Sequence, residues 1–311
     1  STLSSTLGRV LDDAPELSFF EAATMTAFLA FADAKVDLAV VEVGIGGRLD
    51  ATNVLTSPLA TGITTISFDH MDKLGNSMAE IAREKAGIVK PGVPLVVGAG
   101  VRGEALAVIE EIARERGAPL RKAVHTNMVN GTALLGDHQE HNADVSLWLV
   151  HESKILAGRH PQAHLFEGFA NVKWPGRLER IETSEGPWLF DAAHNPEGAR
   201  ALAAYLAQTK EPITLMFGAL ADKAWPEMLD VLTPLARACV YITPNGRKPA
   251  PTADLHARHA GKMAKNADGA MRTARALAGE KGLVVVAGSI FLVGEIRSKL
   301  LGLPVDPPVA L

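Results

Sequence analysis

Short apolar runs rich in Val, Leu and Ile alternate with longer helical patterns along the whole chain. The first run, residues 38–43 (LAVVEV), has the composition of a strand buried on both faces of a parallel sheet. A capping-box spacing at residues 18–21 predicts the start of the helix that precedes it. Alternation of this kind is typical of the α/β class. Further strands are expected at residues 60–67, 95–98, 187–191, 213–218, 240–243 and 283–288.

The chain has 311 residues, which favours two domains because single cores stop growing at roughly 250–300 residues. Helices are expected at residues 18–34, 77–88 and 104–116, from Pro196, from Trp225 and up to Leu301, with mostly helical stretches at 136–168 and 244–278. The alternating series restarts after residues 174–176 (WPG). We therefore expect one domain at residues 1–165 and a second at residues 166–311.

Charge and cysteine content narrow the class of protein. The net charge is -4, with no block of like charge, which argues against nucleic acid as the main partner. The single cysteine, Cys239, excludes an intramolecular disulfide and suits a reducing cytosol. No apolar run approaches the roughly 20 residues of a membrane span. A cytoplasmic protein outside the membrane is expected.

Polar residues follow the predicted strands of the first half, at the edge where α/β sheets bind ligands. Glu42 ends the first run, and the glycine-rich loop 44–50 (GIGGRLD) follows directly. Glycines allow a close backbone approach to a ligand, although a simple strand-to-loop connection gives the same pattern. Asp69 and His70 follow the next run, where His70 could ligate a metal or complete a turn. Lys85 has apolar neighbours; burial would make its amine reactive, whereas solvation is the usual outcome.

The second half repeats this arrangement. Asp191 follows an apolar run and leads through His194 to Pro196, which suits the first turn of a helix. Helix N-termini favour anions, so phosphate would be well placed there. Residues 217–223 (FGALADK) and 287–289 (AGS) end two further runs in the same way. Three such strand ends predict a shared cleft, although each alone could be a structural turn.

Taken in order, these segments resemble the folylpolyglutamate synthase/dihydrofolate synthase family, which is related to the Mur ligases. The resemblance covers nearly the whole chain and depends on many short blocks rather than on one motif. The matching blocks are residues 18–24 (SFFEAAT), 42–53, 69–71, 81–88, 136–139 with 142–143, 174–179 (WPGRLE), 191–196 (DAAHNP), 217–223 and 288–289.

The resemblance implies an α/β fold: an incomplete P-loop NTPase-like parallel-sheet domain of the Mur ligase central type, followed by a smaller Rossmann-like domain. It also implies site residues. Two match protein ligands of Mg²⁺: Glu42 and His70. Lys85 matches a carbamylated lysine that helps to organise a second metal. Five match residues that hold ATP: Asn142, Arg177, Asp191, His194 and, more loosely, Ser289. Lys85 and His194 are the implied catalytic residues.

The substrate side is implied in the same way. Segments that contact the pterin substrate match Ser18, Phe19, Phe20, Glu21, Leu49, Asp50 and Ala51. Looser candidates for the glutamate side are Asp222, Lys223 and Ser289. The implied reaction uses ATP to convert a dihydropteroate or folate carboxylate into an acyl phosphate, which the amine of L-glutamate attacks. Family members are typically monomers, so a monomer is expected.

One part of the family pattern is missing. No GxxxxGK[ST] phosphate loop occurs in the chain. We therefore expect an N-terminally incomplete first domain, weak binding of ATP phosphates, an exposed sheet edge and impaired ligase activity. The alternative is a non-catalytic folate- or nucleotide-binding relative that lacks the loop. A Mur-type cell-wall ligase is disfavoured, because residues 49–53 (LDATN) match the folate branch.

Overall fold

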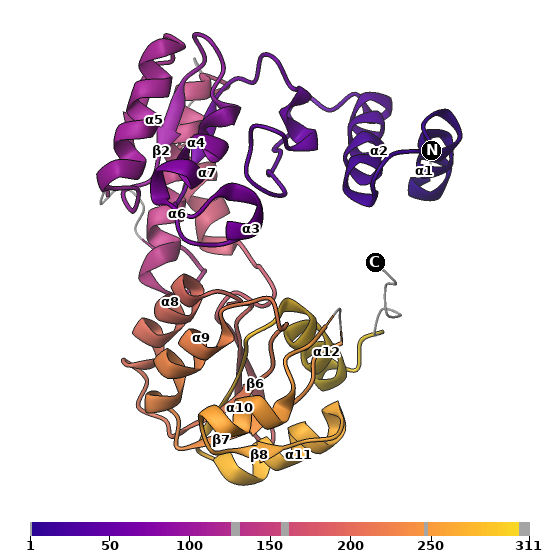
Figure 1. The fold of residues 1–311 in the computed structure, drawn as a ribbon, viewed down its shortest axis with the longest axis vertical. Coiled ribbons are helices and arrows are strands. Elements are labelled where there is room, and N and C mark those ends of the chain that lie inside the picture. Colours follow the sequence, from indigo (N-terminus) through magenta and orange to yellow (C-terminus); the bar gives the residue numbers. More distant parts are fainter. Residues whose placement is uncertain (1, 126–130, 157–161, 246–247, 305–311) are drawn as a thin grey trace. The chain divides into compact units, whose positions relative to one another are not determined.

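The structure is a computed structural model that describes residues 2–125, 131–156, 162–245 and 248–304 (Figure 1). It divides into two compact units. The first contains Ser1–Thr126 and Asp144–Pro161, and the second contains Asn127–Ala143 and Gln162–Leu311. A single division at residue 165 would place residues 131–143 in the first unit, whereas they pack with the second. Helix α6 (Asp137–Ser153) therefore belongs partly to each unit.

The core of the first unit forms around a small parallel sheet. Its strands are β1 (Thr61–Ile63), β2 (Leu95–Val97) and β3 (Leu120–Lys122), in the order β1-β2-β3. Helices α4 (Met78–Lys85) and α5 (Gly103–Glu115) bury Ile81 and Ile109 against Leu95. The first unit also contains the short α3 (Met71–Leu74) and the 3-10 turns η1 (Ala51–Val54) and η2 (Ala86–Ile88).

Two helices begin the chain. Helix α2 (Phe19–Ala34) has the predicted capping box: the Ser18 hydroxyl accepts from the Glu21 amide, and the Glu21 carboxylate accepts from the Ser18 amide at 2.8 Å. Helix α1 (Leu3–Asp13), which was not predicted, packs against it. Although α2 is apolar over most of its surface, only Ala22 and Thr26 are buried.

The strand predicted at residues 38–43 is wrong. The segment has no regular structure, and Val40 is 90% exposed. An isolated extended segment has no partner for its backbone N–H and C=O groups, so apolar composition alone does not make it a strand. Within the described residues, β1 pairs only with β2 and lies at the edge of its sheet.

The second unit, expected to be the smaller, has a six-stranded sheet in the order β4-β5-β9-β6-β7-β8. All neighbours are parallel except β4 and β5. The strand bounds are β4 (Glu179–Thr183), β5 (Gly186–Phe190), β6 (Ile213–Phe217), β7 (Ala238–Tyr241), β8 (Lys262–Met263) and β9 (Leu283–Ala287).

Helices cover both faces of this sheet. Leu283 and Val285 of β9 pack in one core with α8 (Pro196–Leu206) and α9 (Trp225–Leu232). Val284 and Val286 pack in a second core with α11 (Ala267–Ala278) and α12 (Ile290–Leu301). This alternation follows from the two-residue period of a strand. The remaining elements are α7 (Gln162–Asn171), η3 (Thr233–Leu235) and α10 (Thr252–Arg258).

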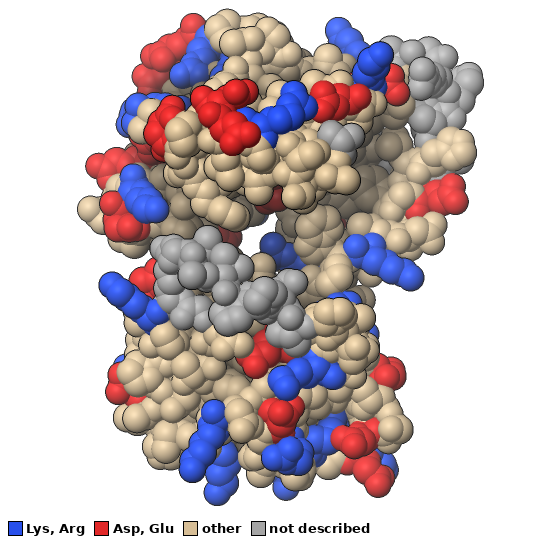
Figure 2. All heavy atoms as spheres, turned by 90° about the vertical axis from the view of Figure 1, so that its right-hand side faces the viewer, with Lys and Arg blue, Asp and Glu red and all other residues tan. Residues whose placement is uncertain are grey.

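The stretch 244–278 is less helical than predicted. It contains α10 and α11, but β8 lies between them and forms the sheet edge next to β7. Both residues of β8 are exposed, so the apolar pattern that marks a buried strand is absent there. Among the described helices, none combines the length and apolar character needed to cross a membrane. Lys and Arg are interspersed with Asp and Glu over the face drawn in Figure 2.

Candidate functional site

The glycine-rich loop of the first unit is organised by Asp50. One carboxylate oxygen accepts from the amides of Gly44 and Ile45, both at 3.0 Å, and the other accepts from the Thr52 amide at 2.9 Å. Partial burial alone would raise the pKa of Asp50. The hydrogen bonds from Thr52, Ile45 and Gly44 outweigh burial, so the pKa is lowered and the carboxylate stays ionised. Both of its oxygens are engaged by its own loop.

The loop packs tightly on the end of α4. A Cβ atom added to Gly47 would lie 2.8 Å from the carbonyl oxygen of Lys85 and 2.9 Å from that of Glu84. The amide of Arg48 donates to the same Glu84 carbonyl at 2.8 Å, and its guanidinium pairs with the Glu84 carboxylate at 2.9 Å. Glycine is therefore required at position 47. The loop fixes residues 49–51 beside the helix end that carries Lys85.

Lys85 is partly buried next to a polar turn. Burial lowers the pKa of its amine, and the negative charge of Asp69 partly opposes this effect. Asp69 accepts from the amide of His70 at 2.9 Å, and His70 adopts a left-handed conformation (φ 51°) where α3 begins. The structure thus brings Asp69, His70 and Lys85 together. Sequence reasoning gave Asp69 no role, although its position beside His70 was the available signal.

Glu42 lies apart from regular structure. It is exposed, in the segment expected to be a strand. Among the residues that the structure describes, no group of three or more His, Cys, Asp and Glu side chains is close enough to hold a metal ion. The assignment of Glu42 and His70 as joint metal ligands therefore stays a prediction.

The two predicted pterin-contact segments meet at one point. A Cβ atom on Gly44 would lie 2.3 Å from the Phe20 ring, so the start of α2 touches the glycine-rich loop. Phe19 and Leu49 are largely exposed. The side chains of Ser18 and Glu21 are occupied in the capping box, and Ala51 begins η1.

In the second unit, Asp191 joins the end of β5 to the turn at residues 174–178. It is 7% exposed, and its two oxygens accept from the amides of Leu178 and Ala193, both at 3.0 Å. Burial raises the pKa of Asp191 despite these hydrogen bonds and the nearby Arg177 guanidinium. Arg177 itself is exposed.

Asn142 is linked to the same neighbourhood through two residues that sequence reasoning left without a role. Asn142 donates to the side-chain oxygen of Gln139 at 3.2 Å, and the Gln139 amide nitrogen lies 3.1 Å from His138 Nε2. Burial lowers the pKa of His138, with Asp191 opposing and Arg177 reinforcing the shift. The helical position of Gln139, three residues before Asn142, was the available signal.

Three strand ends of the second unit carry the remaining predicted residues. Strands β5, β9 and β6 are adjacent and parallel, so Asp191, Ser289 and Asp222 follow carboxyl ends on one sheet edge. The amide of Gly288 donates to the Ala193 carbonyl at 3.0 Å, which joins two of these turns directly. The three strand ends thus share one edge of the sheet, and the cleft predicted there stays a prediction.

Side chains at this edge have defined partners. His194 Nδ1 lies 2.9 Å from the Ala192 carbonyl, and Pro196 occupies the predicted first turn of α8. Ser289 is buried and caps α12, where its hydroxyl accepts from the Phe291 amide at 3.2 Å. Asp222 and Lys223 lie in the turn between β6 and α9, with Asp222 exposed.

Two family models match the chain. Residues 1–98 match the Mur ligase middle domain, and residues 176–290 match the glutamate ligase domain of Mur ligases. The dihydrofolate synthase/folylpolyglutamate synthase of Bacillus subtilis is 33% identical over 314 residues, an alignment that covers 90% of this chain and 72% of the relative. The chain belongs to the folylpolyglutamate synthase/dihydrofolate synthase family.

Solved structures agree with this family and fold. A Mycobacterium tuberculosis folylpolyglutamate synthase complexed with ADP is similar with a TM-score of 0.83 and 29% identity, covering 98% of this chain and 79% of that one. A bifunctional folylpolyglutamate synthase/dihydrofolate synthase with Mn, AMPPNP and L-glutamate bound has a TM-score of 0.84 and 28% identity, with 96% and 76% covered. This family member therefore shares the two-domain α/β Mur ligase fold predicted from its sequence.

In this chain, a member of the folylpolyglutamate synthase/dihydrofolate synthase family, the predicted residues form two groups. In the first unit the glycine-rich loop contacts the start of α2 at Gly44 and the Lys85 backbone at Gly47. The second unit gathers Asn142, Arg177 and Asp191 around His138 and places His194 at the adjacent turn. Among the described contacts, Glu42 joins neither group, and Asp222, Lys223 and Ser289 lie on the adjacent turns of the second unit.

Proposed function

We propose that this chain uses ATP to add L-glutamate to the carboxylate of a dihydropteroate or folate. The observation that carries the proposal is the half-buried Lys85, with a lowered pKa, beside Asp69 and beneath the glycine-rich loop. Carbon dioxide reacts with the unprotonated amine of a lysine, and a lowered pKa makes that amine more available. The neighbourhood therefore supports the carbamylated Lys85 that the family resemblance implies.

The reaction has two steps. An oxygen of the substrate carboxylate attacks the γ-phosphorus of ATP, which forms an acyl phosphate and releases ADP. The glutamate amine then attacks the acyl carbon, phosphate leaves, and the amine gives up a proton as the amide forms. Because water would hydrolyse the acyl phosphate, the site must exclude it.

The first unit would act on the pterin and the metal. Exposed Phe19 and Leu49 offer apolar surface to the flat pterin ring, with Phe20 and Asp50 holding the loop in place. The donor types suit Mg²⁺: Glu42 is an exposed carboxylate, and Asp69 and a carbamate on Lys85 would supply further hard oxygens, which Mg²⁺ prefers, beside His70. In the described residues the acidic and histidine side chains form no cluster close enough to hold the ion. Bound magnesium would supply positive charge that offsets the charge of the transferred phosphoryl group.

The second unit would act on the nucleotide and the glutamate. Arg177 would bind phosphate through its exposed guanidinium, and Asn142 would contact the base. His194, whose Nδ1 lies 2.9 Å from the Ala192 carbonyl at the adjacent turn, would lie near the nucleotide phosphates. Asp222, Lys223 and Ser289 would contribute to the glutamate side. We assign the ATPase role to the first unit and the glutamate-ligase role to the second.

A second candidate is a binding protein without catalysis. It is favoured by one observation: no GxxxxGK[ST] sequence occurs in the 311 residues. These residues therefore lack the phosphate loop, whose backbone N–H groups surround the phosphates of a nucleotide. Residence in the cytoplasm as a monomer is part of both candidates, and the single cysteine is consistent with it.

Calorimetric titration of the chain with Mg-ATP, and separately with dihydropteroate, distinguishes the candidates when paired with an assay for phosphate release. Release that requires ATP, pterin and glutamate together supports the ligase. Pterin binding without turnover supports the binding protein. If neither ligand binds, both candidates fail.

A ¹³C carbamate signal that appears with ¹³CO₂ and is lost in Lys85→Met, but kept in Lys73→Met, tests the role of Lys85.

A further inference from the structure

The turn at residues 174–178 presents Arg177 in an unusual way. Gly176 and Leu178 both adopt left-handed conformations, with φ of 72° and 45°. Both are buried, whereas Arg177 between them is exposed. A leucine rarely takes a left-handed conformation and persists there only when its surroundings hold it. The turn is therefore imposed by contacts from outside it.

Those contacts bracket Arg177 on both sides. On one side the Leu178 amide donates to Asp191 at 3.0 Å. On the other side the Gly176 amide donates to Glu179 Oε2 at 2.9 Å, and the Gly176 carbonyl accepts from the Ala192 amide at 2.8 Å. The backbone on both sides of Arg177 is thus fixed by carboxylates.

The Glu179 carboxylate is itself held from α12. Arg297 donates through Nε to Glu179 Oε2 at 2.7 Å and through Nη2 to Oε1 at 2.8 Å. Each side chain is 21% exposed, so the pair is shielded more than a surface ion pair. This two-point geometry fixes the direction of the carboxylate, which a single ammonium group would not do.

Helix α12 supports the turn at a second point. A Cβ atom on Gly176 would lie 3.0 Å from Val293 Cγ1. Val293 and Arg297 are four residues apart and share one face of α12. The helix thus packs beneath Gly176 with Val293 and holds Glu179 with Arg297.

We propose that Arg297 is a positioning residue that acts through Glu179 to hold the 174–178 turn and so directs Arg177 toward the nucleotide. The inference rests on the proposed function for the role of Arg177, whereas the part about the turn stands on this structure. None of the matching sequence blocks includes Arg297, which lies 118 residues beyond Glu179 in the chain.

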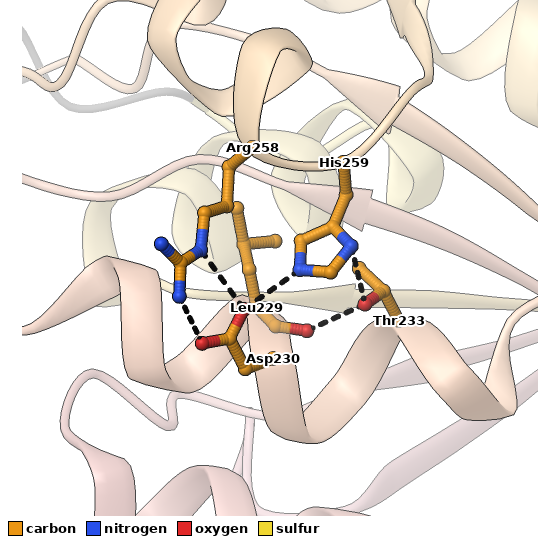
Figure 3. A network of polar contacts seen from close by, with 5 residues as sticks. All are labelled: Leu229, Asp230, Thr233, Arg258 and His259. Atoms are coloured by element: carbon orange, nitrogen blue, oxygen red, sulfur yellow. Dashed lines mark hydrogen bonds and ion pairs between the residues drawn. The ribbon is translucent and has the colours of Figure 1, made fainter.

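A matched control exists in the same unit. Arg258 also forms a two-point pair, with Asp230, and joins α10 to α9 (Figure 3). Its donor Nε lies 2.9 Å from Asp230 Oδ1, and the two side chains are 48% and 41% exposed. Asp230 also contacts His259 at 2.8 Å. No described contact joins this pair to the 174–178 turn, so Arg258→Gln removes a more exposed two-point pair elsewhere in the same unit.

The experiment compares Arg297→Gln, Arg297→Lys, Arg177→Gln and Arg258→Gln in the full chain. Amide hydrogen exchange reports on the turn, Mg-ATP titration reports on affinity, and thermal unfolding reports on stability. We expect Arg297→Gln to speed exchange at Gly176 and Leu178 while β6 and β9 stay protected. ATP affinity should fall about tenfold, the scale of a charged hydrogen-bonded pair. Arg297→Lys should recover only part of both effects.

The double variant Arg177→Gln/Arg297→Gln should bind ATP no more weakly than Arg177→Gln alone, because both act through one guanidinium. Unchanged exchange at Gly176 and Leu178 in Arg297→Gln would overturn the proposal, as would an equal loss of affinity in Arg258→Gln. If Arg177→Gln leaves ATP affinity unchanged, Arg177 has no nucleotide role and the proposal fails with it. The exchange data still show separately whether Arg297 holds the turn.

Discussion

Residues 38–43 of the first unit and β9 of the second are both short apolar runs built mainly from Val, Leu and Ala. Every residue of β9 is fully buried, and the strand pairs with β5 on one side and β6 on the other. Residues 38–43 pair with no described strand, and Val40 is 90% exposed. Nearly the same local composition thus exists in two opposite environments.

The difference lies in the neighbours. A central parallel strand satisfies all its backbone groups through adjacent strands and buries side chains on both faces against helices. In the second unit, α8 and α9 cover one face of β9 and α11 and α12 cover the other. Burial of a strand is therefore a property of the whole sheet, and one residue type can be essential in one unit and nearly neutral in the other.

The largest difference between the two units is expected when a charge is placed in each apolar run. Val285→Asp should destabilise the second unit by about 4 kcal/mol or more, because it buries an unpaired carboxylate. Val40→Asp should change the stability of the first unit by no more than about 0.5 kcal/mol, as at an ordinary surface site. Urea unfolding, monitored by amide hydrogen exchange in each unit, measures both changes in stability. A large loss in Val40→Asp would mean that residues 38–43 are buried in solution.

The same contrast explains what the sequence could predict. The capping box at Ser18 and Glu21, and Pro196 at the start of α8, are local signals, and both were confirmed. Edge strands such as β8 carry no apolar pattern, because their side chains are exposed, and β8 was missed. Amphipathic α1, which packs against α2, was missed as well.

The candidate site divides in a similar way. Asp191 and Arg177 stand in recognisable blocks and were predicted, and the structure brings them together. The partners that hold them come from distant positions: Arg297 is 118 residues from Glu179. No local pattern marks such a residue, because its role exists only after α12 has packed beneath the turn.

Two arginines that donate to backbone carbonyls, one in each unit, sharpen the comparison between the units. Arg275 of the second unit is 8% exposed and donates to the carbonyls of Pro187, Gly279 and Gly282. Arg116 of the first unit is half-buried and donates to the carbonyls of Gly87 and Val89. Arg275→Met should cost about 2–3 kcal/mol, since two buried carbonyls and the part-buried carbonyl of Gly279 lose a charged donor.

Arg116→Met should cost less, about 1 kcal/mol, because Arg116 is itself half-buried and donates to two carbonyls rather than three. Arg272→Met, on the exposed face of α11, is the matched control and should be close to neutral. Chemical denaturation of the three variants provides the test. Equal losses of stability in Arg116→Met and Arg275→Met would show that the burial of the arginine does not determine the cost of removing it.

An effect smaller than that of Arg275→Met is expected at Asp191, whose pKa is raised by burial. Between the ordinary pKa near 3.9 and the raised folded value, the native state binds more protons than the unfolded state. Stability from this group therefore falls as pH rises through that window. Asp191→Asn should remove this pH dependence and cost about 1–2 kcal/mol at neutral pH, because one amide loses its acceptor. Unfolding curves from pH 4 to 7 test both points, and a variant that keeps the wild-type pH slope would contradict the assignment.

The smallest effect is expected at Asp230, which is exposed and paired with Arg258 and His259. Hydrogen bonds from these two side chains lower the pKa of Asp230 to about 2. A carboxyl with a lowered folded pKa stabilises the native state above its ordinary pKa, and this contribution disappears as pH falls toward the folded value. Asp230→Asn should therefore lower the thermal midpoint of the second unit slightly at pH 6, and the difference from wild type should vanish near pH 2. Glu280→Gln, at an exposed turn of the same unit, should show no such convergence. Because salt screens exposed pairs, added sodium chloride should shrink the pH 6 difference for Asp230→Asn more than the loss in Arg297→Gln, whose pair with Glu179 is shielded.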